Sequence, residues 1–165
     1  FVYMLNPIFW PVSIDNFKAK INFHTIANDE IKLSDSMTIK TQIHNHPNDA
    51  FSYKILSNDK IISYVTDCEY VTGSPNEKLI KFSNNSDLLI HDAHFTPEDL
   101  MNHKGWGHSS WEQAVIMAQK SNSKQLILFH HNPNYNDNQV ELIEQKAKQV
   151  FNQTIAAKQG LVIYL

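Results

Sequence analysis

The stretch that decides the fold reads Leu88-Leu-Ile-His91-Asp92-Ala93-His94, then Trp106-Gly107-His108-Ser109-Ser110, and finally Leu126-Ile-Leu-Phe129-His130-His131. The first and last segments are short apolar runs followed by His or Asp, a pattern typical of buried strands that end in polar loops. In the middle segment, Ser110 and Gln113 have the spacing of a capping box, as do Ser109 and Glu112, so we expect a helix over residues 110–120. His108 would then stand at the start of that helix.

The remaining sequence predicts strands first and then strands alternating with helices. Period-two alternation and turn signals predict strands at 20–26, 37–43, 51–56 and 60–66, the last two as a hairpin, with a loop at 27–35. Further along, we expect short helices at 77–82 and from Thr96, strands at 87–91 and 125–129, a long helix at 138–157 and a last strand at 161–165. This order predicts one domain over residues 1–165, of α/β (α+β) class, with a mixed sheet covered by helices.

The amino-acid composition limits which cellular compartments and binding partners we expect for the protein. No apolar run approaches the roughly 20 residues of a membrane span. The formal charge is −3, and all 14 basic residues are lysines, which argues against polymeric nucleic acid as a partner. The single cysteine, Cys68, excludes an intramolecular disulfide and predicts a reducing, cytoplasmic location. The chain opens at Phe1 in apolar sequence without a Met or a basic leader, so we expect a piece of something longer.

Histidines gather where apolar runs give way to loops. Nine of the 165 residues are histidine, and they include three close pairs: His44 and His46, His91 and His94, His130 and His131. Neutral imidazole and carboxylate are the usual ligands of zinc, manganese and iron, and strand ends hold them rigidly. The sequence therefore predicts a metal site.

Five motifs, in this order and spacing, resemble the ribonuclease Z-like branch of the metallo-β-lactamase-fold hydrolases: His46-Pro-Asn-Asp-Ala-Phe-Ser52-Tyr53, Tyr64-Val-Thr66-Asp67, Asp87-Leu-Leu-Ile-His91-Asp92-Ala93, Gly107-His108-Ser109 and Leu126-Ile-Leu-Phe-His130. The resemblance covers nearly the whole chain. It implies the C-terminal half of a metallo-β-lactamase αββα sandwich. It also implies two divalent metal ions, with zinc as first choice and manganese or iron as alternatives.

The resemblance also implies a role for each of five residues. His46 would bind one metal, Asp67 would bridge two, and His130 would bind the second. Asp92 would orient His108, which stands where the family keeps a proton donor. The implied activity is that of a metal-dependent hydrolase, and the pair of Asp92 and His108 favours phosphodiesters as substrates.

Departures from the family narrow the expected substrate. Asp92 replaces a longer Glu, and Asn134 stands where the family has an Arg. Asp67 follows His46 by only 21 positions, which leaves no room for an arm that grips transfer RNA. We therefore expect a small phosphodiester as the substrate.

A missing motif gives the second hypothesis. The family's His-x-His-x-Asp-His loop does not occur in the sequence, so catalysis would need an N-terminal half supplied from elsewhere. The alternative is a non-catalytic half-domain or interaction module that has lost its metal site. A homodimer is left open.

Several single residues have competing interpretations. His44 shares strand parity with His46 and is the alternative ligand, and His131 is expected to pack or to bond a ligand's second nitrogen. We expect His94 and His103 at the surface, His24 as a structural residue within its strand, and Cys68 as a small buried residue. Trp106 either walls the pocket or anchors its loop.

Overall fold

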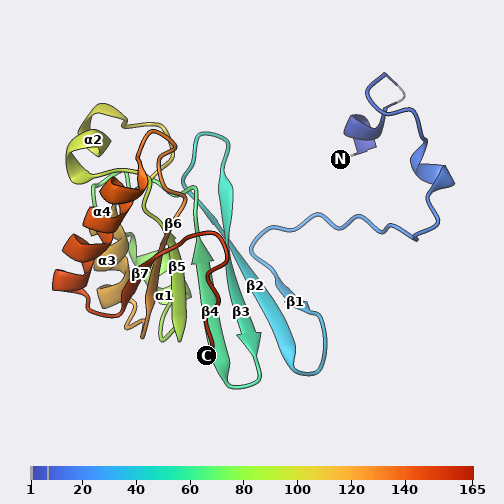
Figure 1. Cartoon of the computed structure of the whole chain (residues 1–165). Coiled ribbons are helices and arrows are strands. Elements are labelled where there is room, and N and C mark those ends of the chain that lie inside the picture. The colour runs from blue at the N-terminus through green and yellow to red at the C-terminus, as the bar shows by residue number, and fades with distance from the viewer. Residues whose placement is uncertain (1, 7) are drawn as a thin grey trace.

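The computed structural model describes residues 2–6 and 8–165, and its strands form one mixed sheet in chain order (Figure 1). The strands are β1 (Glu30–Lys32), β2 (Met37–His44), β3 (Ala50–Ser57), β4 (Lys60–Val65), β5 (Leu88–Asp92), β6 (Leu126–Phe129) and β7 (Thr154–Ala156). Strands β1 to β4 are antiparallel, and β4 to β7 are parallel. A hairpin joins β3 to β4, as the turn at Asn58 predicts, and helical connections join the parallel strands.

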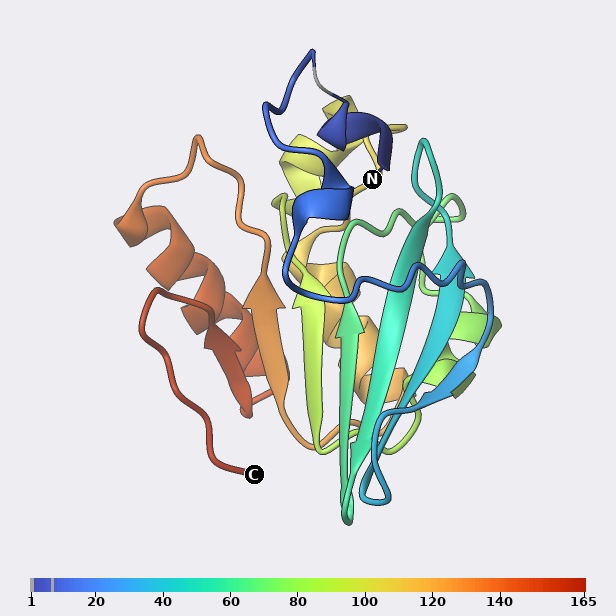
Figure 2. The same cartoon turned by 90° about the vertical axis from the view of Figure 1, so that its right-hand side faces the viewer.

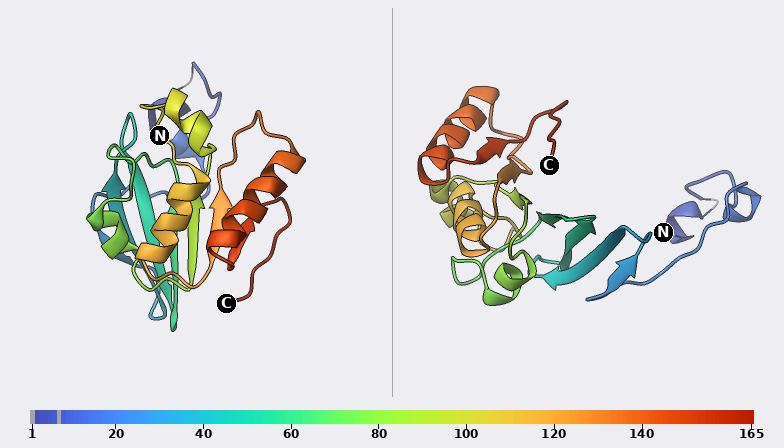
Figure 3. Two further views of the ribbon diagram at one scale, coloured as in Figure 1. Left: turned by 90° about the vertical axis from the view of Figure 1, so that its left-hand side faces the viewer. Right: turned by 90° about the horizontal axis from the view of Figure 1, so that it is seen from below.

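Helices cover one face of this sheet (Figures 1 and 3). They are α1 (Glu77–Phe82), α3 (Trp111–Lys120) and α4 (Asp137–Val150), while the short α2 (Pro97–Asn102) lies beyond the carboxyl ends of the strands. Ser110 caps α3 in a complete capping box with Gln113, as predicted, and Thr96 caps α2. The core between sheet and helices is apolar and includes Val65, Leu89, Met117, Leu128 and Ile143.

The opposite face of the sheet carries no helix among the described residues (Figure 2). Residues in register across a sheet share a face, and the row opposite the helices is apolar: Tyr53, Tyr64, Ile90, Ile127 and Ile155. Residues 2–6 and 8–28, with two short 3-10 helices (Val2–Leu5 and Ile14–Asn16), stand away from the helix layer (Figure 1). No helix among the described residues is long and apolar enough to cross a membrane.

Four predicted elements differ from the structure. Residues 20–26 are not a strand, because no neighbouring strand pairs with them, and His24 is exposed in this extended segment. The strand β1 lies instead inside the predicted loop 27–35, where Glu30–Lys32 pair with β2. The predicted helix 138–157 ends at Val150, because Thr154–Ala156 leave it to pair with β6, and residues 161–165 form no strand.

Candidate metal centre

The chemistry-bearing residues gather at the carboxyl edge of the sheet. Strands β2, β4, β5 and β6 all run towards this edge, where parallel strands end together. Asp92 is the last residue of β5, Asp67 follows β4, and His130 directly follows β6. His46 lies in the loop after β2, and His108 lies three positions before the first residue of α3. Residues distant in sequence thus converge because the strands are parallel.

Two of these residues have a left-handed backbone. Asp67 has a φ of 56° and His130 a φ of 59°, a region that costs most non-glycine residues conformational energy. The turn lets the amide of Asp67 donate to Asp92 Oδ2 at 2.9 Å and lets the carbonyl of His130 accept from His94 Nδ1 at 2.9 Å. The two left-handed turns therefore place the side chains of Asp67 and His130, together with their backbone polar groups, beside Asp92 and His94.

Asp92 is the buried hub of the cluster. Its side chain has no solvent exposure. Its two oxygens accept hydrogen bonds from the backbone amides of Asp67, His94 and Ser109, at 2.9 to 3.1 Å, and from the rings of His108 and His130, at 3.1 and 3.3 Å. Burial alone would raise the pKa of Asp92, but these donors outweigh it and hold the pKa well below its usual range. Asp92 is therefore a permanent carboxylate inside the fold.

The three rings around Asp92 share one hydrogen-bonding pattern. His108 and His130 use Nδ1 towards Asp92, and His94 uses Nδ1 towards the carbonyl of His130. An Nδ1–H that donates to a carboxylate or carbonyl leaves Nε2 as the coordinating nitrogen, the arrangement usual for metal-bound histidine. The hydrogen bond to Asp92 also raises the pKa of His130, against the opposing effect of burial.

Two sets of side chains place potential ligand atoms within 4.8 Å of one another: His46, Asp67 and His108, and His94, His108 and His130. His130 Nδ1 also lies 3.7 Å from Asp67 Oδ1, so Asp67 adjoins both sets. The structure thus brings together all five residues singled out from the sequence. Their roles as ligands or proton donor stay predictions.

Gly107 defines how His46 is held. Its φ is +87°, and a Cβ built on it would lie 2.2 Å from His46 Cδ2 and 2.7 Å from Pro47 Cδ. Only a residue without a side chain fits against that ring. The imidazole of His46 therefore packs against the loop that carries His108. The rings of His46 and His108 are inclined at 64° to each other, with their centroids 6.0 Å apart.

The alternative ligand His44 is committed elsewhere. Its Nε2 bonds the carbonyl of Asp67 at 3.0 Å, and its Nδ1 bonds Ser52 Oγ at 2.8 Å. Burial lowers the pKa of His44 despite the nearby carbonyls. Both ring nitrogens are used, so His44 supports the Asp67 turn, and it belongs to neither ligand set.

The remaining histidines are only partly as expected. His94 is not a surface residue, because it is half-buried and stacks on His108 with centroids 4.3 Å apart. His103 is also half-buried, stacked on Phe95 at 4.7 Å. His131 is half-buried, and its Nε2 donates to the carbonyl of Ala157 at 3.2 Å. The sequence did not predict that His94 lies with His108 and His130, because only the pairing of β6 with β5 brings His130 beside it.

Two other residues border the site. Cys68 is buried beside Ser109 and Tyr70, as expected of a small packed residue. Trp106 is 60% exposed and meets His103 edge to face at 4.7 Å, so it braces its own loop.

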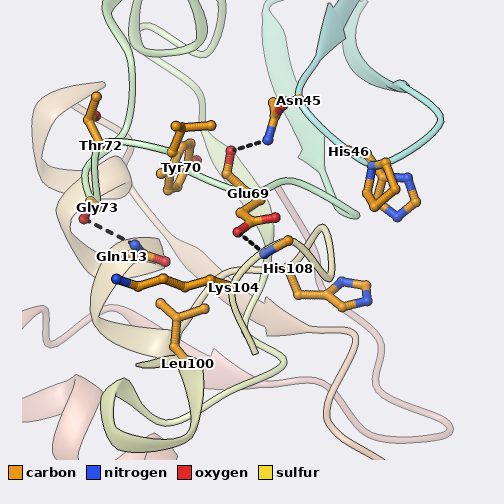
Figure 4. Close-up of a pocket in the computed structure, with 13 residues that line it drawn as sticks. Asn45, His46, Glu69, Tyr70, Thr72, Gly73, Leu100, Lys104, His108 and Gln113 are labelled. Atoms are coloured by element: carbon orange, nitrogen blue, oxygen red, sulfur yellow. Dashed lines mark hydrogen bonds between the residues drawn. The ribbon is translucent and has the colours of Figure 1, made fainter. Parts of the chain in front are cut away.

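A cavity of about 750 Å³ opens beside His46 and His108 (Figure 4). Its walls come from three loops and from α2 and α3, and include Glu69, Tyr70, Leu100, Lys104 and Gln113. The cavity is large enough for a small organic ligand. A substrate held there would lie directly against the candidate ligands.

The donors fit divalent metal ions of the zinc type. Imidazole nitrogens and carboxylate oxygens are ligands that zinc takes. Asp92 accepts from Nδ1 of His108 and His130, and the carbonyl of His130 accepts from Nδ1 of His94, which leaves Nε2 of each ring available. The family that the sequence resembles binds divalent metals, and the described residues offer matching groups.

Comparisons with known proteins agree with this fold. Residues 7–131 match the family model described as "Beta-lactamase superfamily domain". Ribonuclease Z of Sulfurisphaera tokodaii is 40% identical over 106 residues, covering 64% of this chain and 33% of that protein. Ribonuclease Z of Picrophilus torridus is 38% identical over 89 residues, covering 53% of this chain and 28% of that protein. The chain therefore spans about one third of the length of these relatives.

A solved structure shows the same fold. The metallo-β-lactamase fold protein YhfI of Bacillus subtilis superposes with a TM-score of 0.69 at 23% identity, covering 84% of this chain and 54% of that one. The superposition shows that the two chains share a fold. From the matched family model and the ribonuclease Z relatives, this chain belongs to the β-lactamase superfamily, as a ribonuclease Z-like protein of the metallo-β-lactamase fold.

Proposed function

We propose that the chain is the C-terminal part of a dinuclear metal-dependent hydrolase that cleaves a small phosphodiester. The observation that carries this proposal is the buried pair of Asp92 and His108, 3.1 Å apart, beside the set formed by His46, Asp67 and His108. A carboxylate-bound imidazole next to metal ligands suits ester cleavage in which the departing oxygen needs a proton.

Each residue has a defined task in the proposal. His46, Asp67 and His130 would hold two divalent ions, with zinc as first choice. Such ions supply Lewis-acid activation of water and neutralisation of phosphate charge. Asp92 accepts a hydrogen bond from His108 Nδ1 and so orients the ring, and a proton on Nε2 would pass to the leaving oxygen.

The preference for a small substrate rests on two features. The residues between His46 and Asp67 are used up by the β3–β4 hairpin, which leaves no projecting arm for a polymeric RNA. The cavity beside His108 has the volume of a small-molecule site, about 750 Å³. The relatives are named ribonuclease Z, an enzyme that cleaves phosphodiester bonds. The volume of the cavity supports a small phosphodiester as the substrate of this chain.

A complementary half is part of the proposal. The apolar row on the helix-free face is suited to packing against a second sheet, and the matched relatives are about three times as long as the matched segment. A second half on this face would supply the His-x-His-x-Asp-His ligands. On this view the protein works in the cytoplasm, in keeping with its single buried cysteine.

The second candidate function is that of a non-catalytic module. It is favoured by one observation, the absence of the His-x-His-x-Asp-His string from the sequence. Metal analysis separates the two functions. The proposal expects about two transition-metal ions per completed protein and loss of phosphodiester hydrolysis on chelation, whereas metal-free, inactive protein would favour the module.

Two variants test the assigned roles. Asp67→Ala is expected to lose metal, because it removes the bridging carboxylate. His108→Ala is expected to keep its metal while hydrolysis slows by about 100-fold or more, because general-acid catalysis is typically worth 10²–10⁴. His24→Ala, in the exposed segment, is the control. Loss of metal in His108→Ala would make His108 a ligand and refute its role as proton donor.

A further inference from the structure

Glu69 is a charged residue that neither the sequence motifs nor the proposed reaction uses. It lies two positions after Asp67, and its carboxylate reaches the loop between α2 and α3 (Figure 4). Glu69 Oε1 accepts from the backbone amide of Gly105 at 2.6 Å, and Oε2 accepts from that of Gly107 at 3.0 Å. Both oxygens thus bind the same loop, 36 and 38 positions away in sequence.

The backbone of Glu69 is tied to a third loop. Its amide donates to the carbonyl of Asn45 at 3.0 Å, and Asn45 Nδ2 donates back to the carbonyl of Glu69 at 3.3 Å. Asn45 directly precedes His46. One residue therefore connects the loop of Asp67, the loop of His46 and the loop of His108.

The loop that Glu69 holds would otherwise have many conformations. Gly105 and Gly107 have φ of +85° and +87°, and glycine loses more backbone freedom on ordering than any other residue. Hydrogen bonds from amides to a carboxylate are about twice as strong as neutral ones. The bidentate contact therefore selects one loop conformation from many.

That conformation places two candidate site residues at once. Gly107 packs against the ring of His46, at a distance that leaves no room for a Cβ, and its next neighbour is His108. A shift of the loop by 1 Å would change the distance between the rings of His46 and His108 and the approach of His108 to Asp92.

We propose that Glu69 is a positioning residue: its carboxylate clamps the Gly105–Gly107 loop and thereby sets the rings of His46 and His108 at the cavity. The catalytic meaning of the clamp rests on the proposed function, but the clamp itself does not. Glu69 touches no reacting atom in this scheme and acts through the loop.

The clamp can be tested without any activity. The sequence has four glycines, so selective ¹⁵N-glycine labelling gives four backbone amide signals, from Gly73, Gly105, Gly107 and Gly160. In Glu69→Ala, the Gly105 and Gly107 signals are expected to move upfield and to exchange faster with solvent, while those of Gly73 and Gly160 stay in place. Glu141→Gln, an exposed change on α4, is the matched control and should move none of the four. Unchanged Gly105 and Gly107 signals in Glu69→Ala would overturn the proposal.

The functional arm uses Glu69→Gln, which keeps the size of the side chain and one acceptor oxygen. In the protein completed by its N-terminal half, with bis(p-nitrophenyl) phosphate and Zn²⁺, we expect kcat to fall by about 10- to 100-fold at a nearly constant KM, because misplacement by about 1 Å can cost 10² in rate. The urea midpoint should change little. An unchanged kcat in a protein whose glycine signals have moved would refute the positioning role. If the wild type does not hydrolyse this ester, the proposed function fails, and the glycine signals still decide whether the clamp exists.

Discussion

Replacing Gly107 by Ala is expected to damage metal binding far more than folding. A Cβ at this position would lie 2.2 Å from His46 Cδ2 and 2.7 Å from His46 Nε2, whereas carbon atoms normally approach to about 3.5–4.0 Å. The ring of His46 must therefore retreat by more than about 1 Å. It can do so because it is a half-buried side chain, while Pro47 and the clamped loop are less free to move.

Gly105→Ala is a matched control for the backbone. Gly105 has nearly the same φ, +85° against +87°, but a Cβ there meets nothing within 4 Å. Both variants should lose about 1–2 kcal/mol of unfolding free energy from the left-handed conformation of alanine. Only Gly107→Ala should also lose Zn²⁺ affinity. We expect a loss of about 10- to 100-fold, because changes to the groups that orient a metal ligand usually weaken metal binding by that factor.

Urea unfolding measures the first quantity, and competition with a chromophoric zinc chelator measures the second. Equal zinc affinities in the two variants would show that His46 is not a ligand, or that the loop and not the ring gives way. Either result would refute the reasoning from the contact between Gly107 and His46.

Three further predictions follow from buried groups. Asp92→Asn should lower the unfolding free energy by about 3 kcal/mol, because the new amide nitrogen would face hydrogen-bond donors that bind a buried carboxylate in the wild type. A urea midpoint equal to that of the wild type would contradict this. Burial lowers the pKa of His91 to about 4, so the unfolded chain, with a pKa near 6.5, binds a proton that the folded chain does not. His91 should therefore contribute a loss of stability of about 3 kcal/mol as the pH drops from 7 to 4. Urea unfolding over the same range should give a clearly smaller slope for His91→Gln than for the wild type, and equal slopes would contradict this. Burial raises the pKa of the Cys68 thiol, so iodoacetamide should modify it only in urea; alkylation of the folded chain, detected by mass spectrometry, would disprove that.

Much of the fold was predictable because local signals agreed with tertiary packing. The capping box at Ser110 and the Pro97 helix start are side-chain features of the helix itself, so their boundaries could be predicted from sequence. Alternation along β2, β3 and β4 was equally informative, because the apolar side chains of these paired strands share one face of the sheet.

The wrong elements depended on partners that no local pattern reveals. Residues 20–26 alternate like a strand, but a strand needs a neighbour, and the described residues give them none. At 154–156 the apolar pattern suited a continuing helix, yet β6 offered an open edge and Glu144 accepts from the amide of Ala156, which holds that segment beside the sheet. Long-range pairing decided both cases.

The candidate site was predictable as a set of residues but not as a geometry. Apolar runs that give way to histidines indicated His130, and the family resemblance implied Asp67 and Asp92. The stacking of His94 on His108 and the contact of Gly107 with His46 come from loops meeting across the sheet edge, where sequence spacing carries no information.

The strand order has a consequence for biosynthesis. Each strand of the sheet pairs with its neighbour in the chain, so the sheet can grow in the order of translation. Asp67 emerges with β4 and Asp92 with β5, but His130 arrives only after β6 has been added. A nascent chain halted before β6 would contain Asp67 and Asp92 but not His130, so under the proposed function the set of candidate metal ligands is complete only when most of the domain is already built.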